Sequence, residues 1–285
     1  AKPGCRRSAP PAAVVLPPGP AAMFAPTRDS LEACCRDDAS ADPQAAARLV
    51  GDMGPLGRLW LRPEVVALAD RFTGGAALPR APLGSGGLHA LLLTPGRGRY
   101  AALRPAFALP LRWVAGDAHS PHLPPGLADF AASLLADHGP ELDIPSPPAG
   151  RWTLQPGGGL EGRCDFSRFD FECAWDSATA SLLGGLLLAA IGAPPDERVM
   201  ASVAWGTGGL GRVEGVSHKL DAALAAGARL VFLSAANRDD ARTWRDAHPG
   251  SSLQTVLLEP AATLRESLET FLQAIEGRPG IDAPL

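Results

Sequence analysis

The sequence predicts an α+β fold in which strands and helices alternate through the C-terminal half. Three observations support this prediction. Apolar residues make up 46% of the 285 residues and charged residues 20%, so the chain can bury a large core. Short apolar runs of strand length alternate with segments of helical length from about residue 168 onward. Residues 178–191 are almost all apolar or small, which predicts a helix that is buried on most sides.

The N-terminal part of the chain differs in composition from the rest. Residues 1–28 contain seven prolines and little periodicity, which favours an extended arm over a domain. Helices are expected after it at 42–50 and 63–72. We therefore expect a proline-rich arm with a small helical region at residues 1–80 and a main domain at residues 81–285.

The main domain is expected to open with a hairpin or meander of strands and to continue as alternating strands and helices. Proline and glycine separate the apolar runs. The expected elements begin with strands at 88–93, 100–103 and 107–114, a helix at 127–137, a loop rich in proline and glycine at 140–162, a strand at 168–175, the buried helix at 178–191 and a strand at 199–205. They continue with a glycine-rich turn at 206–211, a helix at 218–226 capped by Ser217 and ended by Gly227, a strand at 229–233, a helix at 237–247, a strand at 253–259 and a helix at 262–276.

Charge, hydropathy and cysteine spacing exclude several classes of protein. The formal net charge is −4 and no run of basic residues occurs, so no nucleic-acid partner is expected. No stretch of about 18 apolar residues occurs. Prolines interrupt residues 10–25, where a secretory signal needs a helix, so we expect a cytoplasmic protein with no membrane contact. The five cysteines have no C-x-x-C pair, which argues against a disulfide framework.

Ser177 is the first candidate for chemistry. It follows a predicted strand and precedes the predicted buried helix. At such a junction, free backbone N–H groups and the helix dipole can stabilise an oxyanion beside a serine hydroxyl. Asp176 and Ser177 are also common helix-capping residues. The position therefore fits either a nucleophile or a structural cap.

Lys219 is the candidate base for that nucleophile. Only two of the 26 basic residues, Lys2 and Lys219, are lysines, so an interior lysine suggests a role that arginine cannot fill. On the predicted helix, Ala222, Ala223 and Ala226 share its face. A lysine enclosed by apolar groups loses preference for its charged form and can accept a proton. The alternative is a surface lysine with a buried stem.

Other groups carry weaker signals. Asp117, His119 and His122 have residue types that bind metals, but they lie in a proline-rich stretch with no fourth ligand in view, so we expect a solvated loop. Residues 84–87 are expected to form a turn. The adjacent Cys34 and Cys35 do not by themselves indicate reactive thiols. No metal or other cofactor is expected.

Two segments together resemble a known family. Residues 176–179 read Asp-Ser-Ala-Thr, and residues 215–223 read Gly-Val-Ser-His-Lys-Leu-Asp-Ala-Ala. They resemble the proteolytic domain of the Lon protease family, particularly its archaeal type, which has a D-S-A-S motif and a G-V-x-x-K-[I/L]-x-A-A motif. The 42-residue separation of Ser177 and Lys219 agrees with the family's spacing to within about a residue. The resemblance covers residues 160–275 well and 85–160 in general outline.

The resemblance implies the Lon proteolytic-domain fold and a serine peptidase with a Ser177/Lys219 dyad. Asp176 would orient the junction, and backbone N–H groups near Ala178 would hold the oxyanion. No G-x-x-x-x-G-K-[S/T] motif of an ATPase occurs. The implied activity is therefore ATP-independent cleavage of unfolded or loosely folded polypeptides. The implied partners are the polypeptide substrate, a separate unfoldase or adaptor, and further copies of the chain in a homo-oligomeric ring.

A second interpretation remains open from the sequence. Ala174 stands where some archaeal-type members have an acidic residue, and the segment between Gly211 and Lys219 is shorter than in the family. These differences fit a catalytically inactive Lon-like domain that acts as a protein-interaction or assembly module.

Overall fold

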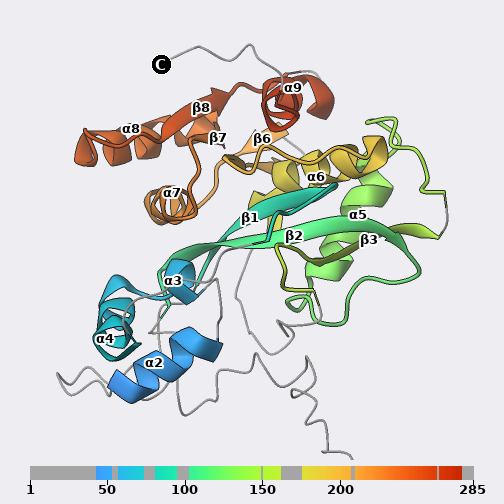
Figure 1. The fold of residues 1–285 in the computed structure, drawn as a ribbon. Helices are drawn as coiled ribbons and strands as arrows, with labels where there is room; N and C mark the ends of the chain where they lie inside the picture. The colour runs from blue at the N-terminus through green and yellow to red at the C-terminus, as the bar shows by residue number, and fades with distance from the viewer. Residues whose placement is uncertain are drawn as a thin grey trace, which may run out of the picture.

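Figure 1 shows a mixed α+β fold around a six-stranded sheet, in agreement with the predicted class. The fold is that of a computed structural model, which describes residues 43–52, 57–73, 81–94, 103–148, 150–161, 175–206, 209–261 and 263–277. The strand order is β3-β2-β1-β4-β7-β8. These strands are β1 (Gly87–Leu93), β2 (Ala106–Gly116), β3 (Arg151–Pro156), β4 (Val199–Ser202), β7 (Leu230–Ser234) and β8 (Gln254–Leu258).

The sheet has an antiparallel part and a parallel part. β1, β2 and β3 pair as an antiparallel meander, and its β1–β2 hairpin confirms the one expected from the apolar runs. β1, β4, β7 and β8 are parallel neighbours. Parallel strands need crossover connections, and helices α7 (Val216–Ala225) and α8 (Arg238–Ala247) provide them from β4 to β7 and from β7 to β8. The predicted alternation in the C-terminal half is therefore confirmed.

Helices cover both faces of this sheet. Alternate side chains of a strand point to opposite faces. Ala90 and Leu92 of β1 pack in a cluster with α5 (Leu127–His138) and α6 (Thr179–Ile191), whereas Leu91 packs in a cluster with α7 and α8. Helix α9 (Leu264–Ile275) lies on the α6 side. Figure 1 shows the same separation of α7 and α8 from α5, α6 and α9. No helix in the described ranges is long and apolar enough to cross a membrane.

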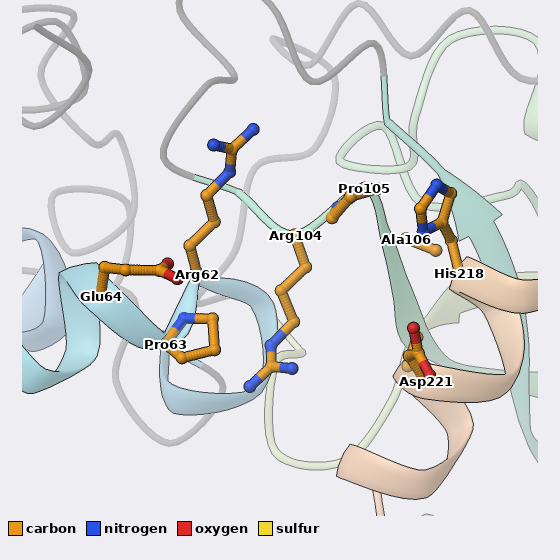
Figure 2. A pocket seen from close by; sticks show the side chains of 9 residues that line it. Arg62, Pro63, Glu64, Arg104, Pro105, Ala106, His218 and Asp221 are labelled. Carbon is orange, nitrogen blue, oxygen red and sulfur yellow. The ribbon is translucent and has the colours of Figure 1, made fainter. Parts of the chain in front are cut away.

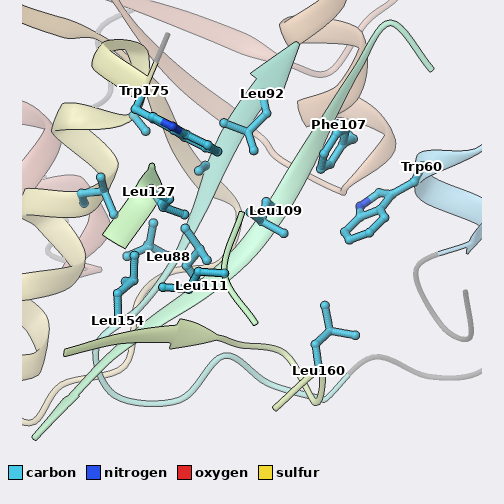
Figure 3. Close-up of a cluster of buried hydrophobic side chains, with 14 of the residues drawn as sticks. Trp60, Leu88, Leu92, Phe107, Leu109, Leu111, Leu127, Leu154, Leu160 and Trp175 are labelled. Atoms are coloured by element: carbon cyan, nitrogen blue, oxygen red, sulfur yellow. The ribbon is translucent and has the colours of Figure 1, made fainter. Parts of the chain in front are cut away.

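The small N-terminal helices share a core with the sheet. Trp60 is 2% exposed, and its ring centroid lies 4.9 Å from that of Phe107 on β2. Its indole Nε1 donates to the Ala108 carbonyl at 3.0 Å, and Figure 3 shows these side chains together. The predicted arm, residues 1–28, and the residues after it up to 42 lie outside the described residues. The helices are α2 (Pro43–Asp52), α3 (Gly57–Trp60) and α4 (Pro63–Thr73).

Helix α6 is the buried helix that the sequence predicts. A 3₁₀ turn, η5 (Trp175–Ala178), leads into it. Most of its residues are buried, and Trp113 Nε1 donates to the Leu182 carbonyl at 2.9 Å. A Cβ at Gly185 would clash with the buried Leu88 side chain of β1, which would have to shift, so this helix approaches β1 closely here.

The prediction of a loop over residues 140–162 is wrong in part. β3 lies inside it and pairs with β2, from Leu111 opposite Pro156 to Gly116 opposite Arg151. Trp152 and Leu154 point into the core. Proline is tolerated at such an edge strand because its missing N–H breaks no ladder on the solvent side.

The predicted strand at 199–205 and the glycine-rich turn after it also differ from the structure. β4 ends at Ser202, and the chain then forms a separate two-stranded sheet of β5 (Ala204–Gly206) and β6 (Gly209–Gly211). The ladder breaks at Val203 because its N–H donates to the Ser177 carbonyl at 3.0 Å. The predicted strand at 168–175 lies outside the described residues except for Trp175, and so does 100–102 of the strand predicted at 100–103.

Candidate active site

Ser177 lies at the carboxyl edge of the parallel strands. Its carbonyl accepts the Val203 N–H directly after β4. One helical turn later, Ser181 Oγ donates to the Ala201 carbonyl at 3.1 Å and ties α6 to the same strand. Together these bonds fix the start of α6 against the end of β4.

Ser177 is not a helix cap. The N-cap of α6 is Ala178, and no side chain makes a capping bond there. The neighbouring hydroxyl of Thr179 donates to the Asp176 carbonyl at 2.7 Å. Ser177 is 7% exposed, and no hydrogen bond joins its hydroxyl to another described residue. The capping interpretation of Ser177 is therefore wrong, and its hydroxyl is left for other chemistry.

Lys219 is a buried lysine on the first turns of α7. Its exposed fraction is 2%, and Ala222 and Ala223 on the same helix are 4% and 0% exposed. Lys219 is thus buried on the same helix as these alanines, and the alternative of a surface lysine is wrong. The neighbouring His218 is exposed, as expected from its place about 100° further around the helix.

The start of α7 brings Lys219 to the same sheet edge as Ser177. Gly215 is the N-cap, with a left-handed φ of 64°, and a Cβ there would lie 2.4 Å from Leu93 Cδ2 at the end of β1. β1 and β4 are parallel, with Ala90 opposite Ala201, so their carboxyl ends adjoin. Helical side chains lean toward the helix N-terminus, which directs Lys219 toward this edge. The predicted cap Ser217 is wrong, because the left-handed Gly215 starts the helix before it.

Asn237, for which the sequence pattern predicts only a helix start, positions this region. It is 0% exposed. Its Oδ1 accepts the Val213 N–H at 3.0 Å, and its Nδ2 donates to the Val213 carbonyl at 2.9 Å. This pairing holds the segment that leads into α7 against the end of β7. Asn237 is the one asparagine in the chain. This scarcity is a sequence signal of a special role, as the scarcity of lysine is for Lys219.

The other two predicted site residues flank Ser177. Asp176 is exposed, and Ala178 is completely buried. Both belong to η5, so the structure keeps them beside Ser177 at the helix start. Ala174 lies outside the described residues.

The stretch from Asp117 to His122 is not simply a solvated loop. His119 Nδ1 accepts the Leu154 N–H at 2.8 Å, and its ring packs edge-on to Trp113. Burial lowers the pKa of His119, and the nearby Arg151 charge lowers it further. The ring therefore serves β3 as a neutral acceptor. In the described part of the chain, no group of three or more His, Cys, Asp or Glu side chains could hold a metal ion.

Comparison of the sequence with protein-family models and with curated proteins finds no match to this chain. Any assignment of chemistry therefore depends on the residues themselves. The residues that carry it are a buried lysine and an uncapped serine at one edge of the sheet.

Proposed function

We propose that this chain is an ATP-independent, Lon-like serine peptidase that cleaves unfolded or loosely folded polypeptides. Ser177 is the nucleophile and Lys219 the general base. The observation that carries the proposal is the burial of Lys219, 2% exposed, at the sheet edge that also holds the uncapped Ser177. Burying an ammonium is costly, and a buried lysine at such a place is a candidate functional residue.

The reaction follows from the chemistry of these two groups. The neutral amine of Lys219 takes the Ser177 hydroxyl proton as Oγ attacks the peptide carbonyl carbon. Backbone N–H groups at the helix start near Ala178 stabilise the oxyanion, and Asp176 orients the junction. The lysine then returns its proton to the leaving amine, which breaks the C–N bond and leaves an acyl-enzyme. Water then attacks the ester carbonyl and gives a proton to Lys219. Lys219 passes this proton to Ser177 Oγ as the ester C–O bond breaks, which releases the acid product and restores both the serine hydroxyl and the neutral amine.

Substrate unfolding is not part of this mechanism. The proposal has no step that uses ATP, so folded proteins should resist cleavage unless a separate unfoldase or adaptor delivers them. A homo-oligomeric ring would enclose the sites and limit access to extended chains. Analytical ultracentrifugation of the purified protein tests the ring.

An unstructured substrate tests the peptidase activity. Wild type should cleave casein, and Ser177→Ala should not. Ser217→Ala is the matched control, because it removes an exposed serine hydroxyl from α7 and should leave the rate unchanged. Equal cleavage by wild type and Ser177→Ala, or none by either, would count against the proposal.

The alternative is a non-catalytic interaction or assembly module. The segment between Gly211 and Lys219, which is shorter than in the Lon family, favours it. A serine-reactive phosphonate probe separates the two functions. A covalent adduct on Ser177 supports the peptidase, whereas an unlabelled, well-folded protein supports the module.

A further inference from the structure

A pocket of about 430 Å³ lies between the N-terminal helices and α7. Figure 2 shows Arg62 and Glu64 at the start of α4 on one side and His218 and Asp221 of α7 on the other. Arg104 lies between them, next to the first residues of β2. The pocket therefore spans the junction between the N-terminal helical region and the helix that carries Lys219.

The two arginines are held in place by backbone carbonyls. Leu61 and Leu103 form an isolated antiparallel bridge. Arg62 Nε donates across it to the Leu103 carbonyl at 3.2 Å, and Arg104 Nε donates to the Leu61 carbonyl at 3.0 Å. Each bond uses one of the five N–H donors of a guanidinium and restrains its long side chain.

Among the described residues, no acidic side chain pairs with the remaining donors of these arginines. Neither guanidinium forms an ion pair with a described residue, although two carboxylates line the same pocket. One of these, Asp221, accepts the indole N–H of Trp244 at 2.7 Å and lies 3.6 Å from His248. The other, Glu64, is exposed in the first turn of α4.

We propose that this pocket binds an acidic side chain of the polypeptide substrate, with Arg104 as its partner. The identity of the ligand as a substrate segment rests on the proposed peptidase function. A restrained guanidinium with free N–H groups suits a carboxylate, which it can bind with two parallel hydrogen bonds. Glu64 and Asp221 disfavour further acidic residues beside it, so a single acidic residue among neutral ones is the preferred ligand.

The pocket adjoins the candidate active site. His218 and Ala222 line it and stand on either side of Lys219 in α7. Ala106, also in its lining, pairs with Leu93, whose side chain contacts the α7 N-cap Gly215. The pocket therefore lies beside the helix that carries Lys219, where a neighbouring part of a bound polypeptide can reach it.

Binding can be measured without cleavage in the Ser177→Ala variant. The probes are two short, fluorescently labelled, unstructured peptides with amidated C-termini that differ in one residue, Glu or Gln. Fluorescence anisotropy should give a Kd about tenfold lower for the Glu peptide, as a charge-assisted hydrogen bond implies. This preference should shrink as ionic strength rises. Both peptides are tested against the same folded protein, so equal Kd values for the two would overturn the proposal.

Two variants locate the effect. Adding Arg104→Gln should abolish the Glu preference, whereas Arg242→Gln, which removes an exposed arginine of α8 outside the pocket, should retain it. Retention of the Glu preference in Arg104→Gln would overturn the assignment to Arg104.

The C-terminal carboxylate of a peptide is the other possible ligand, and a Gln peptide with a free C-terminus tests it. If this peptide binds more tightly than the amidated Glu peptide, the pocket binds chain termini instead of acidic side chains. If the Glu preference holds while wild type cleaves neither peptide, the pocket stands and the peptidase proposal fails.

Discussion

Replacing Asn237 with alanine tests whether its side chain holds the approach to α7. The change removes the acceptor for the Val213 N–H, the donor to the Val213 carbonyl and the 3.0 Å bond to Asp240. Val213 is 4% exposed, so water cannot readily replace the lost partners. A buried polar group left unsatisfied costs about 1–3 kcal/mol. With two such groups, the free energy of unfolding should fall by about 2–6 kcal/mol.

Urea denaturation followed by circular dichroism measures this loss. Gln273→Ala is the matched control, because it also removes a side-chain amide, but from an exposed position on α9 whose bond is to Glu269. It should change the stability by less than about 0.5 kcal/mol. If Asn237→Ala loses no more stability than Gln273→Ala, the bidentate bond does not hold this segment. The reasoning about the placement of α7 would then be refuted.

Three further predictions follow from packing, protonation and charge. Gly185→Ala should destabilise the fold by about 1–3 kcal/mol through overpacking. Gly51→Ala in α2, where a new Cβ meets nothing within 4 Å, should instead stabilise the fold by up to about 1 kcal/mol. A higher melting temperature for Gly185→Ala than for Gly51→Ala would contradict the packing of α6. Because the pKa of His119 is lowered in the folded state, its contribution to stability is full above the ordinary value of 6.5 and is lost as the pH falls through the lowered pKa. Urea midpoints should therefore decline more from pH 8 to pH 5 in wild type than in His119→Ala, and parallel declines would refute this. Lys219→Arg should abolish casein cleavage, because guanidinium cannot accept the serine proton; a fully active variant with a normal melting temperature would exclude Lys219 as the base.

The elements with strong local signals were predictable. The run 178–191, almost all apolar or small, predicts a buried helix, and α6 follows its bounds to within a residue. The helix at 262–276 is observed as α9, where Thr263 and Glu266 form a capping box. Such segments are specified by periodicity and end signals that lie within a few residues of one another.

Elements that depend on distant partners were not predictable. β3 lies in a stretch rich in proline and glycine and becomes a strand because β2 offers it a paired edge. β4 stops at Ser202 because the next N–H bonds to Ser177, 26 positions earlier in the chain. Neither partner leaves a mark in the local sequence, so hydrophobic pattern alone could not set these boundaries.

The sequence by itself determined the fold class, most helices and the pair of residues to examine, because periodicity, residue scarcity and motif spacing are local or countable properties. Only the tertiary structure decided that Lys219 is buried, that Ser177 caps no helix and that both belong to one edge of the sheet. It also decided that Asn237 holds the segment leading into α7. Burial and hydrogen-bond partners are set by residues far apart in the chain, and those contacts exist only once the sheet has assembled.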